Sequence, residues 1–135
     1  MADTNTADLQ HTIDALIRAF GEHDTTAYFS SFSPDATFVF YTHPVPLPSR
    51  DAYRDLWTEW ESDGFRVLAC RSSEQNVTFP APEVAVLTHR VGTTVRDSSG
   101  TVELDERETI MFRHREGSGW IAVHEHLSPQ FHPAE

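Results

Sequence analysis

Apolar residues recur at helical spacing in the first part of the chain. From Asp8 to His23 they fall three or four positions apart, which predicts an amphipathic helix with one buried stripe. The stripe comprises Leu9, Ile13, Leu16, Ile17 and Phe20. A shorter helix is expected after Asp24, a favoured capping residue, and the run ATFVFY predicts a strand from Ala36. Ser49 can cap a third helix, RDAYRDLWTEWES, which ends near Gly64.

After the third helix the pattern changes to long strands separated by short turns. Strands are expected at residues 65–79, 84–97, 102–115 and 120–127, with PAPE, DSSG and EGSG as the turns. Helices in one half and strands in the other are typical of an α+β domain, in which helices cover one face of a curved antiparallel sheet. We expect a single domain over residues 1–135, with residues 1–7 flexible.

Strand alternation predicts which side chains face the helices, because the more apolar face of a strand is the covered one. In the strand 84–97 this face comprises Ala85, Leu87, His89, Val91, Thr93 and Val95. In the strand 102–115 it comprises Val102, Leu104, Glu106, Glu108, Ile110 and Phe112. His89 and Glu108 are therefore expected among apolar neighbours. In the last strand neither face is plainly polar, as expected if helices cover one face and a partner subunit the other.

Composition narrows the class of protein. The fractions of hydrophobic (39%) and aromatic (11%) residues are those of a globular protein. No apolar run approaches the roughly 20 residues of a membrane helix. The acidic N-terminal stretch MADTNTADLQ does not resemble a signal peptide, so a soluble, cytoplasmic protein is expected. The lone Cys70 has no partner for an internal disulfide.

The net negative charge of the chain argues against anionic partners. The chain has 21 acidic and 10 basic residues, and its formal net charge is −11. Nucleic acids and anionic membranes need clustered positive charge and are therefore not expected as partners. All the basic residues are arginines, so the chain lacks the lysine required for Schiff-base chemistry and for phosphate-binding loops of the Walker type.

Three segments carry a family resemblance. FGEHDTTAYFSSFSPDATFVF, SRDAYRDLW and RETIMFRHREGSGWIAVHEHLS resemble the nuclear transport factor 2-like superfamily, and within it the SnoaL-like group with ketosteroid isomerase and polyketide cyclases. The last segment is also similar to the association domain of calcium/calmodulin-dependent kinase II, a non-catalytic scaffold. The resemblance implies a cone-shaped fold, in which a bent sheet surrounds a pocket closed by helices. It also implies a homodimer formed through the outer face of the sheet.

The resemblance suggests positions for a site. Glu108 falls where ketosteroid isomerase carries the protonated acid of its oxyanion hole, and His124 and His126 fall on pocket-lining positions of the last strand. Glu125 between them is then expected to turn outward. His43 lies near the position of the general base.

Of the remaining positions, two match the pattern of the isomerase and one departs from it. Leu87 and His89 match pocket-lining positions of the third strand. Leu16 occupies the place of the oxyanion tyrosine, which argues against steroid isomerisation. The side chains expected to contact a ligand are Leu16, Phe20, Tyr41, Tyr53, Trp57, Trp60, Leu87, Ile110 and Phe112.

Two uses of these residues stay open. Burial raises the pKa of a carboxyl group, so Glu108 is expected to be protonated, unless it forms a buried ion pair with His89 or His124. Histidines can act as general base or proton shuttle. His124 and His126 could instead bind a metal together with His89 and Glu108, but few relatives of this fold hold a metal, and neither metal nor cofactor is predicted.

The sequence therefore predicts a small-molecule pocket. The first hypothesis is a cofactor-independent isomerase, dehydratase or cyclase that acts by proton transfer on an apolar or aromatic carbonyl compound. The second hypothesis is a non-catalytic ligand-binding or dimerisation module.

Overall fold

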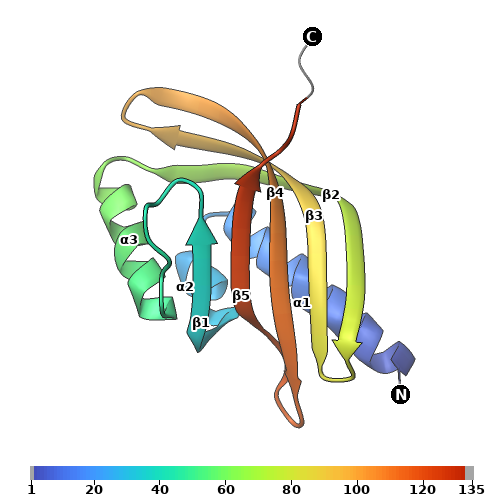
Figure 1. Ribbon diagram of the computed structural model, residues 1–135. Coiled ribbons are helices and arrows are strands. Elements are labelled where there is room, and N and C mark those ends of the chain that lie inside the picture. The colour runs from blue at the N-terminus through green and yellow to red at the C-terminus, as the bar shows by residue number, and fades with distance from the viewer. Residues whose placement is uncertain (1, 133–135) are drawn as a thin grey trace.

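The computed structural model describes residues 2–132, which form three helices and one five-stranded sheet (Figure 1). The helices are α1 (Ala2–Gly21), α2 (Thr25–Ser30) and α3 (Arg50–Ser62). The strands are β1 (Phe32–Phe40), β2 (Arg66–Ala81), β3 (Val84–Asp97), β4 (Gly100–Arg115) and β5 (Gly119–Pro129). The predicted α+β architecture is confirmed. None of the described helices is both long and apolar enough to cross a membrane.

The sheet is open and strongly curved, with the strand order β1-β5-β4-β3-β2. Strands β2 to β5 form the predicted antiparallel meander, whereas β1 pairs with β5 in parallel. Helix α1 runs across one face of the sheet, and α2 and α3 lie near β1 (Figure 1). The helices therefore close the concave side of the cone, where a pocket was expected.

Local sequence signals explain most of the element boundaries. The Ser49 side chain accepts a hydrogen bond from the backbone N–H of Ala52 at 3.1 Å, and this cap starts α3 where it was predicted. Strand β1 begins before the expected Ala36 and includes Pro34. Its pairing with β5 is interrupted between Phe32 and Thr37, so the missing N–H of proline breaks no regular ladder there.

The N-terminal helix is longer than predicted, because α1 already includes residues 2–7. The flexibility expected of residues 1–7 stays a prediction, and residue 1 lies outside the described residues.

A bulge in β5 reverses the predicted face assignment for the part of the strand that follows Ala122. Phe112 pairs with Ala122 and Met111 pairs with His124, so Val123 is an extra residue in β5. The strand therefore changes phase, and Ala122 and Glu125 both become buried. The predictions that His124 and His126 line the pocket and that Glu125 turns outward are wrong, because alternation was counted through an irregular strand.

Candidate functional site

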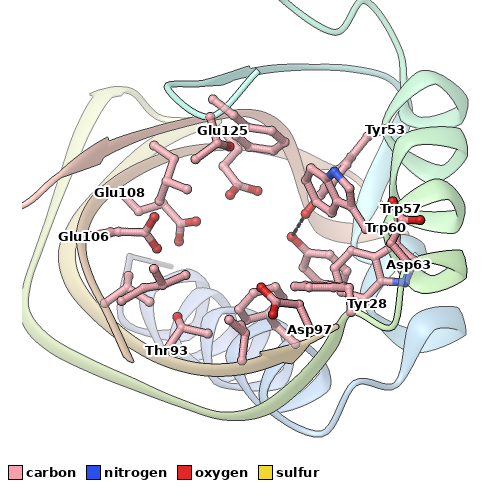
Figure 2. A pocket seen from close by; sticks show the side chains of 18 of the residues that line it. Tyr28, Tyr53, Trp57, Trp60, Asp63, Thr93, Asp97, Glu106, Glu108 and Glu125 are labelled. Atoms are coloured by element: carbon pink, nitrogen blue, oxygen red, sulfur yellow. Dashed lines mark hydrogen bonds between the residues drawn. The ribbon is translucent and has the colours of Figure 1, made fainter. Parts of the chain in front are cut away.

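A cavity of about 500 Å³ lies between the concave face of the sheet and the helices (Figure 2). Its walls are largely aromatic and include Phe20, Tyr28, Phe40, Tyr53, Trp57, Trp60 and Phe65. Its acidic lining residues are Asp63, Asp97, Glu106, Glu108 and Glu125. A volume of this size falls within the range of roughly 300–1,000 Å³ that small-molecule pockets occupy.

Three glutamates enter the cavity from two neighbouring strands. Glu106 and Glu108 lie two positions apart on β4, so both point to the concave face, as alternation predicted. Glu125 comes from β5, where it pairs with Ile110, the residue two positions after Glu108. Figure 2 shows the three carboxyl groups pointing into the same space.

Glu108 is held by a buried histidine. Its Oε1 lies 2.7 Å from Nε2 of His89, and Nδ1 of His89 lies 2.7 Å from Oγ of Ser72. Burial alone would raise the pKa of Glu108, but the hydrogen bonds from Glu125 and His89, and the charge of His89, hold it below its ordinary value. The predicted protonated Glu108 is therefore wrong, and the predicted alternative, a buried pair with His89, is present.

The pKa of Glu125 is shifted in the opposite direction from that of Glu108. The residue is only 4% exposed, and its Oε1 has no hydrogen-bond partner among the residues that the structure describes. Burial, followed by the negative charge of Glu108, raises its pKa well above the ordinary value. Glu125 is thus the group that carries the proton, the role that sequence reasoning gave to Glu108.

Glu106 is the third carboxyl group, and its pKa is raised mainly by burial. Tyr41 donates a hydrogen bond from its hydroxyl to Oε2 of Glu106 at 2.6 Å. Tyr41 was expected to contact a ligand, but it is half exposed and does not line the cavity. It acts on the site only through Glu106.

Two tyrosines add neutral hydroxyl groups to the cavity. The hydroxyls of Tyr28 and Tyr53 lie 2.8 Å apart, as the dashed line in Figure 2 shows. Burial raises the pKa of both phenols, so both keep their protons near neutral pH. Tyr28 packs edge-on against Tyr53, Phe29 and Phe32, which fixes its ring.

The structure brings together some of the predicted ligand contacts. Glu108, Phe20, Tyr53, Trp57 and Trp60 line the cavity. The other predicted apolar contacts, Leu16, Leu87, Ile110 and Phe112, are at most 5% exposed and belong to the hydrophobic core. They do not line the cavity, because close packing fills the part of the cone in which they lie.

The remaining predicted histidines lie away from the cavity. His43 follows β1, where its backbone N–H donates to the carbonyl oxygen of Phe40, and its neighbour Thr42 lines the cavity instead. Nδ1 of His124 lies 2.8 Å from Oγ1 of Thr37, and His126 is exposed. These positions separate His124 and His126 from His89 and Glu108, so the proposed metal set does not form. The described residues contain no cluster of histidine, cysteine and acidic side chains that could hold a metal.

Sequence reasoning missed Glu106, Glu125 and Tyr28 as site residues. Glu106 belonged to the apolar face of its strand, so the signal for it was present. Tyr28 lies in the FGEHDTTAYF segment, but nothing in its spacing distinguished it from a core residue. Glu125 required knowledge of the bulge.

The family follows from a comparison with known domains. The model of the SnoaL-like domain matches residues 9–132. The chain belongs to the SnoaL-like family. No curated protein matches the sequence.

Solved structures support the same fold for this SnoaL-like chain. A nuclear transport factor 2-like superfamily protein from Salmonella enterica superposes with a TM-score of 0.82 at 14% identity, covering 99% of this chain and 96% of that one. A ketosteroid isomerase-like protein from Erwinia carotovora gives 0.76 at 13% identity, with 93% and 95% covered. A protein of unknown function in nutrient uptake from Rhodospirillum rubrum gives 0.78 at 18% identity, with 91% and 98% covered.

Proposed function

We propose that this SnoaL-like protein is a cofactor-independent isomerase, dehydratase or cyclase that moves a proton on an apolar carbonyl compound. The observation that carries the proposal is the pairing of Glu108, whose pKa is lowered, with Glu125, whose pKa is raised, in one aromatic cavity. Two titratable groups with divergent pKa values are the usual arrangement of a general base beside a general acid.

Glu108 takes the role of the base. Its carboxylate removes a proton from the carbon next to the ligand carbonyl, and the electron pair of that C–H bond moves toward the carbonyl oxygen. His89 orients the carboxylate, and Ser72 in turn fixes the imidazole ring. Glu108 then returns the proton to the same or a neighbouring carbon, or to a leaving hydroxyl group.

Glu125 takes the role of the acid. Its proton, which Glu108 accepts in the site without ligand, turns to the carbonyl oxygen of the ligand, on which negative charge develops as the C–H bond breaks. The buried, low-dielectric surroundings strengthen this hydrogen bond relative to one in water. The tyrosine pair, Tyr28 and Tyr53, supplies further neutral donors at the edge of the same space.

Proton exchange tests the proposal directly. Neutral and cationic ketones with an apolar body are incubated with the protein in heavy water, and NMR follows the replacement of their α-protons by deuterium. Glu108→Gln is expected to lower the exchange rate by roughly 10²- to 10⁴-fold, the usual contribution of a general base. Glu125→Gln is expected to lower it by about 10²-fold, because it removes the acid but leaves a weaker amide donor.

Glu116→Gln is the matched control, since Glu116 is exposed near the β4–β5 turn and lies outside the cavity lining. It is expected to exchange ketone protons at the wild-type rate. Folded Glu108→Gln protein with wild-type exchange, or no exchange by the wild type, would contradict the enzyme proposal and favour the non-catalytic ligand-binding module.

A further inference from the structure

The lining of the cavity is charged with one sign only. It contains five carboxyl groups, from Asp63, Asp97, Glu106, Glu108 and Glu125, and no arginine, lysine or histidine among the described lining residues. A concave site with one sign of charge concentrates ligands of the opposite sign and repels anions. The formal net charge of −11 on the whole chain acts in the same direction.

The acids lie on two sides of the cavity. Asp63 follows the end of α3 and Asp97 ends β3, and Figure 2 shows both across the cavity from Glu106 and Glu108. Asp97 accepts hydrogen bonds from the backbone N–H of Ser99 at 2.8 Å and from its hydroxyl at 2.6 Å. These hydrogen bonds lower the pKa of Asp97, so its carboxylate keeps its charge near neutral pH.

Aromatic faces stand beside the two aspartates. The rings of Trp60 and Phe65, whose centroids lie 5.5 Å apart, line the same part of the cavity, whereas Trp57 is only 1% exposed and its ring stacks on His23. Tryptophan faces attract organic cations, and the attraction grows when water is excluded.

Glu125 supplies an independent sign of a ligand. It is buried and lines the cavity, and its Oε1 has no partner among the described residues. A buried polar atom without a hydrogen bond is costly, and a ligand that offers one removes the cost.

We propose that the substrate class of this cavity is a carbonyl compound that also carries an organic cation, a protonated or quaternary amine. The ammonium group lies between Asp63, Asp97 and the face of Trp60. Glu125 then donates its proton from the unpartnered Oε1 to the carbonyl oxygen instead of donating it to Glu108. The proposal rests on the proton-transfer function above and specifies the substrate of that same site.

A matched pair of ketones tests the charge preference. 4-Acetyl-N,N,N-trimethylanilinium and 4-tert-butylacetophenone have nearly the same shape and differ in charge. Binding is followed by quenching of the tryptophan fluorescence, since Trp57 and Trp60 line the cavity, and by calorimetry. The cationic ketone is expected to bind about tenfold more tightly than the neutral one, the effect of one desolvated cation–aromatic contact.

Variants locate the preference. Asp97→Asn and Asp63→Asn are each expected to reduce the ratio of the two dissociation constants by about threefold, and Glu116→Gln is expected to leave it unchanged. Melting curves confirm folding. Asp63→Asn serves as the second test should loss of the Asp97 hydrogen bonds unfold the β3–β4 turn.

Equal or tighter binding of the neutral ketone would overturn the proposal, as would binding of neither, or a preference that is undiminished in the double aspartate variant. These failures are separable from failure of the catalytic proposal. Exchange of neutral ketones without a charge preference overturns only the substrate class. A charge preference without proton exchange overturns only the catalysis.

Discussion

Glu108 and Glu125 carry the same side chain in the same cavity, yet their surroundings move their pKa values in opposite directions. Glu108 has a histidine at 2.7 Å, whereas Glu125 has the negative charge of Glu108 nearby and an oxygen without a partner among the described residues. One proton therefore serves two carboxyl groups, and it resides on Glu125. In the proposed mechanism, the neighbouring His89 makes Glu108 the base and leaves the role of the acid to Glu125.

Stability against pH reveals the titration of Glu125. Because its pKa is raised in the folded protein, its protonated form stabilises the fold fully below the unfolded pKa of about 4.5, and this contribution is lost as the pH rises through the higher folded value. A tenfold difference in proton affinity between the folded and unfolded chain corresponds to about 1.4 kcal/mol. Glu125→Gln removes the titration, so we expect the variant and the wild type to be similarly stable at acidic pH and the variant to be the more stable above the raised pKa.

Urea unfolding from acidic to alkaline pH measures this difference. Glu116→Gln removes an exposed acid of the same type, and its stability curve is expected to run parallel to that of the wild type. If the curve of Glu125→Gln ran parallel as well, Glu125 would have an ordinary pKa and the assignment of the acid would fail.

At the scale of elements, the regular helix α3 and strand β3 could be predicted from the sequence, whereas the bulged strand β5 could not. The cap and apolar spacing of α3 gave its bounds, and alternation gave the buried face of β3, from Ala85 to Val95. In β5 a single extra residue, Val123, moved Glu125 into the cavity and both histidines out of it. A bulge depends on pairing with β4 and β1, which are remote in sequence, so the periodicity of β5 alone could not reveal it.

Helix α3 forms one wall of the cavity, and its stability depends on the N-terminal cap that Ser49 provides. Ser49→Ala removes the side-chain oxygen that accepts the Ala52 N–H, and we expect the free energy of unfolding to fall by about 1 kcal/mol. Ser62→Ala, the same change at the other end of α3, removes only a bond to the carbonyl oxygen of Thr58 and is expected to change stability by less than about 0.5 kcal/mol. Chemical denaturation of both variants measures the difference, and equal losses would contradict the capping role.

At the scale of the whole molecule, the cavity is kept open against the tendency of protein interiors to fill their space. Aromatic side chains of α3 belong both to the hydrophobic core and to the lining of a cavity of about 500 Å³. Five acidic groups share that cavity in a chain whose formal net charge is already −11. Such an arrangement lowers stability, and the proposed ligand site accounts for it.

Filling the cavity tests this trade-off. Val91 is 4% exposed and lines the cavity, so Val91→Phe adds apolar volume in the direction of the empty space. We expect the free energy of unfolding to rise by about 0.5–2 kcal/mol, the usual gain from filling a cavity, and the affinity for 4-tert-butylacetophenone to fall at least about tenfold.

Val102→Phe adds the same group at a position that is 40% exposed and outside the lining, and it is expected to leave binding unchanged. Thermal melts and fluorescence titrations measure both quantities. If Val91→Phe left binding intact, the ligand would occupy another site. If it lowered stability, the space beside Val91 would be too well packed to serve as the binding cavity.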